Sequence, residues 1–358
     1  MKNDYRELEK KYKPNYLKMV TGHPLFGFIA LSAVLIVIQL LFMFGDGIVS
    51  LTVSRAINIT MIYTIAALGL GILMGLAGLT SLGSAAFIGL GAYTAGNILK
   101  AMNLPFVLVL VGVIIVGIVL GLVLGFISLR VRGLHLMIIT MAFASILNEL
   151  FRTPNSFTGG ANGLTLVPFP KLLAFIPLKR DTVYFLVLAV LFVLIVITLN
   201  IINSPTGRAM MTMSNSESLA QSLGIHILTH RVLAFVISTV YCMIAGALFI
   251  SAQTATDAYS WTMLLSLNLL AAVILGGTAH PAGVIIGSFI IFCLDLAVLK
   301  NIPFFQKYTS ASTIFAGVLI ILIVVKYPGG LMRLLSNIKD GVKKLYDKWR
   351  VYKYGPEN

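Results

Sequence analysis

Charged residues are scarce in this sequence. Asp, Glu, Lys and Arg make up only 11% of its 358 residues, whereas about a quarter of the residues of a soluble domain are charged. A globular protein of this length needs a charged surface, and this chain cannot supply one. The composition therefore predicts an integral membrane protein.

Patterns typical of enzymes and metal sites are also missing. The two cysteines, Cys242 and Cys293, lie inside apolar runs, so they indicate neither a disulfide framework nor a metal site. The histidines form no His-Glu-x-x-His pair, and no glycine-rich stretch ends in the Gly-Lys-Ser/Thr of a phosphate loop. We expect no catalytic residue, metal or cofactor on this chain. If the protein moves a solute against its gradient, the energy must then come from an ion gradient or from another subunit.

Apolar runs of about 20 residues, long enough to cross roughly 30 Å of hydrocarbon, recur along the chain. We expect an all-α membrane protein with about ten transmembrane helices. A cytoplasmic segment (1–24) precedes the transmembrane domain (25–330), and a basic amphipathic cytoplasmic tail (331–358) follows it. The first run shows no cleavage site and is expected to be retained. The predicted spans are 25–44, 56–77, 82–99, 106–129, 134–151, 183–202, 232–252, 262–277, 283–299 and 312–326.

The net charge of +14 indicates topology rather than nucleic-acid binding. If there are ten spans and the N-terminus is inside, most Lys and Arg residues fall on the cytoplasmic side, where they are preferred. We therefore expect both termini inside and contact of the excess charge with anionic lipid. Few acids lie within spans. Asp295 and Glu149 permit ion coupling without arguing for it, so a stand-alone secondary transporter stays open.

Glycines crowd two regions of the sequence, one in the second and third spans and one around Gly276 and Gly277. Small residues allow helices to pack closely, and they also allow a helix to break and expose its backbone to a cavity. The similar positions in the two halves suggest an internal repeat and a pathway near both clusters. Leu275–Gly283 is either a short loop or a re-entrant break.

The segment 204–231 is polar and contains a short predicted helix. Ser214 and Glu217 fit a capping box, and Gly224 is placed to end the helix in a left-handed turn. Leu219, Ala220 and Leu223 form an apolar patch between them. A helix of about two and a half turns is marginal in water. It must dock on a partner or rest on its own membrane domain.

Several motifs, in this order, resemble the M-type permease subunit of branched-chain amino acid importers of the ATP-binding-cassette (ABC) class. The resemblance covers nearly all of residues 50–335. It rests on the segment 204–231 together with Gly75–Gly96 (GLAGLTSLGSAAFIGLGAYTAG), Leu129–Ile146, Thr158–Leu164, Leu270–Phe289 and Tyr327–Leu331.

The resemblance implies an importer made of several subunits. This chain would pair with a second permease, two cytoplasmic ATPases that bind ATP and Mg²⁺, and an extracytoplasmic substrate-binding protein. Glu217, Ala220 and Gly224 match the coupling motif. The full set of candidate residues comprises Arg208, Glu217, Ala220, Leu223 and Gly224 for ATPase coupling; Ser81, Ser84, Ser145, Gly276, Gly277 and Asp295 for the translocation pathway; and Thr158, Gly159, Gly160 and Asn162 for the loop facing the binding protein.

Three positions depart from the family pattern. Ser84 stands where relatives commonly carry His or Gln, Ser145 where they often carry an acid, and Gln221 where a Glu often precedes the coupling glycine. The first two are expected near the pathway, so the substrate stays open. Urea, short amides, nucleosides and sugars are alternatives to amino acids.

Overall fold

The computed structural model describes residues 26–44, 51–102, 104–128, 133–154, 157–160, 163–166, 180–278, 280–298, 317–318 and 330–331. The chain divides into two compact units, Met1–Val49 and Ser50–Asn358. In the first unit, α3 (Phe26–Phe44) has 19 residues and no charged side chain, as a helix in lipid requires.

The second unit is almost entirely helical. It also contains two two-residue strands, β1 (Leu164–Thr165) and β2 (Ala255–Thr256). A 3₁₀ turn, η3 (Ala258–Ser260), follows β2. The helices are α4 (Leu51–Gly71), η1 (Ile72–Leu76), α5 (Ser84–Met102), α6 (Phe106–Ser128), α7 (Leu134–Arg152), α8 (Arg180–Asn203), α9 (Pro205–Asn215), α10 (Glu217–Ser222), α11 (Ile227–Gln253), α12 (Met263–Gly276), α13 (Pro281–Ser288) and η4 (Phe289–Val298).

The helices follow the predicted spans closely. Every predicted span except the last coincides with a helix, although α4 and α13 continue as π-helices, η1 and η4. Within the described part of the chain, 6 helices are long and apolar enough to cross a membrane, and two shorter apolar helices accompany them. Most of the last predicted span (312–326) and most of the tail (331–358) lie outside the described residues, so the number of spans stays a prediction.

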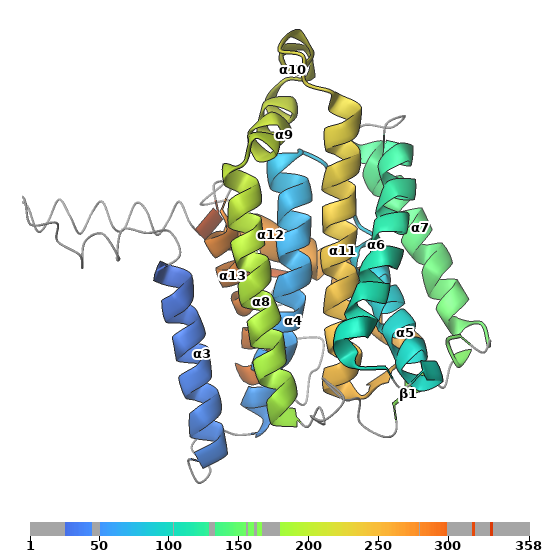
Figure 1. Ribbon diagram of the computed structural model, residues 1–358, viewed down its shortest axis with the longest axis vertical. Helices are drawn as coiled ribbons and strands as arrows, with labels where there is room; N and C mark the ends of the chain where they lie inside the picture. Colours follow the sequence, from blue (N-terminus) through green and yellow to red (C-terminus); the bar gives the residue numbers. More distant parts are fainter. Residues whose placement is uncertain are drawn as a thin grey trace, which may run out of the picture. The chain divides into compact units, whose positions relative to one another are not determined.

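Helix α11 lies at the centre of the second unit. It packs along α4, α5 and α6, and Figure 1 shows α4, α6, α8 and α11 running side by side. Side chains of α4 and α11 are mostly buried, whereas α6 exposes most of its apolar surface, including Val111, Ile115 and Val119. Such a surface must contact lipid or another membrane subunit.

Close helix contacts depend on glycine. On α6, Gly117, Gly121 and Gly125 face α11 at intervals of one turn, and a Cβ atom at Gly121 would lie 2.5 Å from Val236 Cα. Between α5 and α11, a Cβ at Gly91 would lie 2.3 Å from the Met243 carbonyl oxygen. Gly91 belongs to the first glycine cluster of the sequence, and its contact is one of close packing, the first of the two roles considered for that cluster.

The loop after α7 is tied to the connection between α11 and α12. Strand β1 pairs antiparallel with β2, with Leu164 opposite Thr256. The fully buried Trp261 donates from Nε1 to Thr256 Oγ1 at 3.0 Å and packs edge-on against Phe249. This small sheet links the two halves of the unit at the end opposite to α9 and α10 (Figure 1).

Candidate coupling site and membrane interior

Helix α9 begins the polar segment and was not predicted from the sequence. Ser204 caps it, because its Oγ accepts a hydrogen bond from the Gly207 N–H at 3.1 Å, and Pro205 occupies the first helical position. A serine followed by proline is a typical helix start, and this signal could have revealed the helix. Met210 and Met213 are buried and hold α9 against the rest of the unit. Arg208 is exposed and donates to the Asn203 carbonyl.

The predicted capping box at Ser214 is wrong. Ser214 lies within α9, which continues to Asn215, and Met213 beside it is buried. Ser216 has an extended backbone (φ −158°, ψ 114°), and its Oγ accepts from the Leu219 N–H at 3.3 Å. Helix α10 is therefore only 6 residues long, shorter than the sequence suggested.

The predicted end of α10 is confirmed. Gly224 has a φ of +74°, in the left-handed region that favours glycine. The Ile225 N–H donates to the Ala220 carbonyl at 2.9 Å, and the Gly224 N–H donates to the Gln221 carbonyl at 3.0 Å. These two bonds form a Schellman motif, which satisfies carbonyls that a helix end leaves free.

The predicted apolar patch on α10 divides into two parts. Ala220 is fully buried and anchors the helix, whereas Leu219 is 53% exposed and Leu223 is 64% exposed. Residues four apart on a helix lie on the same face. Helix α10 thus leaves two leucines exposed on one face. Figure 1 shows α10 beyond the ends of the long helices.

An ion pair joins α10 to α11. The Arg231 guanidinium donates from Nη2 to Glu217 Oε1. Arg231 is only 4% exposed, and the Glu217 side chain is 28% exposed. The sequence indicated Glu217 as a coupling residue but identified Arg231 only as a positive charge on the cytoplasmic side. No local pattern pairs residues 14 positions apart on different helices.

The glycine-rich stretch after α4 contacts both the coupling segment and the turn between α12 and α13. A Cβ atom at Gly75, in the π-helix η1, would lie 2.0 Å from the Thr278 carbonyl oxygen. At Gly78, where φ is +67°, a Cβ atom would lie 2.5 Å from Ser214 Oγ. The two glycine clusters of the sequence therefore meet beside α9. Single-turn π-helices are rare and frequently lie at functional sites.

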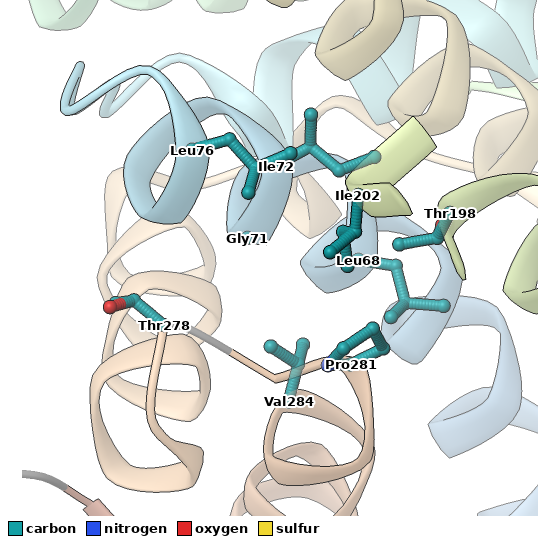
Figure 2. Close-up of a pocket in the computed structure, with 9 residues that line it drawn as sticks. All are labelled: Leu68, Gly71, Ile72, Leu76, Thr198, Ile202, Thr278, Pro281 and Val284. Carbon is teal, nitrogen blue, oxygen red and sulfur yellow. The ribbon is translucent and has the colours of Figure 1, made fainter. Parts of the chain in front are cut away.

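Figure 2 shows a small cavity at this junction. Side chains of α4 and η1 (Leu68, Ile72), α8 (Ile202) and α13 (Val284) line it, and the lining is nearly all apolar. Its volume of about 10 Å³ corresponds to a single water molecule. An amino acid cannot bind there.

Two pathway candidates lie at the buried start of α5. Ser81 and Ser84 are 2% and 1% exposed. Residues 81–83 are not helical, and the first N–H groups of α5 have no partner within the helix, so hydroxyl groups of distant helices satisfy N–H groups here. Leu82 N–H donates to Thr140 Oγ1 of α7, and Ala85 N–H donates to Ser266 Oγ of α12, each at 3.0 Å. Helices α5, α7 and α12 thus converge on a buried polar cluster.

The other pathway candidates lie elsewhere. Ser145 is exposed on α7 and donates to the Met141 carbonyl. Gly276 packs against the backbone of Gly283, and Gly277 ends α12 with a φ of +100°, so a tight turn joins α12 to α13. Asp295 belongs to η4, but its side chain lies outside the described residues.

The predicted loop for the binding protein is a tight turn where it is described. Gly159 and Gly160 have φ values of +71° and +62°. Thr158 is buried, and its Oγ1 accepts from the Gly160 N–H at 3.2 Å. Asn162 lies outside the described residues.

A second hollow is an apolar groove of about 560 Å³ between α6, α8 and α11. Residues lining it include Ile114, Val193 and Val240. The groove exposes no polar atom that could orient the charged groups of an amino acid. Its chemistry suits hydrocarbon.

Most of the chain matches a known protein family. The model of the family described as branched-chain amino acid transport system / permease component matches residues 52–324. The chain belongs to this permease family. The resemblance found in the sequence motifs is therefore confirmed, and the protein is a multi-pass membrane protein that acts as one component of a transporter with other subunits.

Two curated relatives of this permease carry the same name. The high-affinity branched-chain amino acid transport system permease protein LivM of Escherichia coli (strain K12) is 31% identical over 314 residues, which are 80% of this chain and 72% of that protein. LivM of Salmonella typhimurium (strain LT2) matches with the same identity and coverage. No solved structure matches the chain significantly.

Proposed function

We propose that this permease imports branched-chain amino acids and is driven by ATP hydrolysis on partner subunits. Its family and both LivM relatives support the substrate class. The observation that carries the ATPase coupling is the leucine pair on α10. Leu219 and Leu223 are exposed on a helix that is itself anchored by Ala220. Two cytoplasmic ATPases, which bind ATP and Mg²⁺, are the partners proposed for this surface.

Ten spans with both termini inside would place α9 and α10 in the cytoplasm. The distribution of Lys and Arg along the chain supports this orientation. The loop around Gly159 and Gly160 would then face the outside, where the binding protein delivers substrate. The pairing of β1 with β2 gives that loop a fixed position.

A second permease subunit would complete the translocation pathway. The junction cavity holds about one water molecule, and the larger groove is wholly apolar, so neither can carry an amino acid across this chain alone. A pathway between two permease subunits would need neither of these two hollows.

The test replaces Leu219 and Leu223 together by serine. Burying a leucine contributes about 1.5–3 kcal/mol, so losing both should remove most of the ATPase affinity. We expect the double variant to reach the membrane at the parent abundance, because neither side chain is buried in this chain. ATPase co-purification and ATP-dependent uptake of radiolabelled leucine should both be lost.

The matched control is Met102→Ser, which changes a 65% exposed apolar side chain at the end of α5. It should leave uptake and ATPase binding unchanged. In the parent protein, excess isoleucine and valine should compete with labelled leucine, and urea should not. Leucine uptake at the parent rate by the Leu219→Ser, Leu223→Ser variant would contradict the proposed coupling surface.

A further inference from the structure

The ion pair between Glu217 and Arg231 lies in an unfavourable place for a cation. Arg231 is buried in the first turns of α11, and the first turn of that helix carries no acidic residue. The positive end of the helix dipole repels a cation there, and an unpaired buried charge is strongly destabilising. The Glu217 carboxylate compensates for both effects. The pair is therefore a firm connection between α10 and α11.

Helix α10 is held to α11 at both of its ends. Glu217 at its first residue contacts Arg231, and Gly224 closes the Schellman turn that leads into α11. Ala220 is buried between these two points. With both ends held, α10 cannot rotate about the turn at Gly224 without breaking the ion pair.

Helix α11 in turn contacts its neighbours through their backbones. A Cβ at Gly246 would lie 1.9 Å from the Ile88 carbonyl oxygen of α5, and a Cβ at Gly91 of α5 would lie 2.3 Å from the Met243 carbonyl oxygen of α11. No flexible side chains separate these helices at the two contacts. A displacement of α11 must therefore move α5, whose first turn adjoins the polar cluster around Ser84.

We propose that Arg231 is a positioning residue that transmits displacement of α10 into α11. The inference rests on the proposed function, because it requires an ATPase that pulls on Leu219 and Leu223. Arg231 acts only through Glu217. With the ion pair intact, α10 and α11 move together. Without it, α10 is joined to α11 through the turn at Gly224 alone, and ATP is hydrolysed without moving α5.

The decisive variant combines Glu217→Gln with Arg231→Met. It removes both charges, and replacing a buried ion pair by uncharged groups of similar size is often neutral for stability. The assay uses the purified transporter in liposomes, with its ATPases and binding protein, and measures leucine transported per ATP hydrolysed. We expect parent abundance, normal ATPase co-purification and continued hydrolysis. The ratio of leucine to ATP should fall about tenfold, a usual size for coupling between two sites.

The matched control is Arg55→Met, which removes an exposed arginine from α4 and should keep the parent ratio. A parent ratio in the double variant would overturn the role of Arg231, since a purely structural pair predicts that result. If the double variant fails to assemble, Arg231→Lys is measured instead. Lysine keeps the charge but lacks the guanidinium Nη2 that contacts Glu217, so the ratio should fall several-fold with the ATPase still bound, and an unchanged ratio would overturn the proposal. A parent transporter that moves leucine without any ATPase would instead overturn the proposed function, and this inference with it.

Discussion

Replacing Gly224 by valine would alter the backbone at the end of α10 without creating a clash. A Cβ atom at this position meets no atom within 4 Å, and φ is +74°. A branched residue held there costs about 1–3 kcal/mol. Helix α10 has only 6 residues over which to spread that strain, so the strain falls on the two Schellman bonds. Because 1.4 kcal/mol is tenfold in affinity, binding of the ATPase should weaken about 5- to 150-fold.

The matched control is Gly224→Asn, because asparagine tolerates the left-handed region. Binding is measured by titrating the labelled ATPase onto the permease in lipid nanodiscs, alongside leucine uptake in cells. We expect the valine variant to reach the membrane at normal abundance but to lose affinity and uptake, while the asparagine variant stays close to the parent. Equal binding by the two variants would refute the reasoning. Loss of the valine variant from the membrane would show that α10 belongs to the folding core instead.

Three further predictions follow from packing and topology. Gly121→Ala should lower the melting temperature of the detergent-solubilised protein, because overpacking against the α11 backbone costs about 1–3 kcal/mol; Gly112→Ala meets only the end of one flexible side chain and should not. Trp261→Ala should cost about 3–5 kcal/mol, and reduced surface expression would report it; unchanged expression and melting would contradict the packing described. A reporter that functions only in the cytoplasm should be active when it is fused after Asn358. Activity of a reporter that functions only outside the membrane would exclude the ten-span arrangement.

The sequence predicted the long helices well because lipid demands long apolar runs. The span predicted at 106–129 is α6, Phe106–Ser128, and that predicted at 25–44 is α3, Phe26–Phe44. The end of α10 at Gly224 was also predictable, because it depends on a single residue type in a local turn. In each case the signal lies within one segment.

Features that depend on distant residues could not be predicted in this way. Glu217 follows Ser214 by three residues, so the sequence favoured Ser214 as the cap, yet in the folded chain α9 continues to Asn215 and Ser216 caps α10. The hydroxyl of Ser266 satisfies the N–H of Ala85 from 181 positions away. Such pairs exist only once the helices have packed.

The contact between α6 and α11 repeats along its length. Gly117, Gly121 and Gly125 are equally spaced, and they meet Val240, Val236 and Val232, which are equally spaced on the antiparallel partner. Sliding α6 by four residues, about 6 Å, would therefore bring glycine opposite valine again. The hydrogen bond from Thr239 Oγ1 to the Gly117 carbonyl, 3.0 Å long, distinguishes the observed register from its neighbour. The spacing of glycine and valine alone therefore does not fix the register of the two helices, and this hydrogen bond supplies the missing constraint.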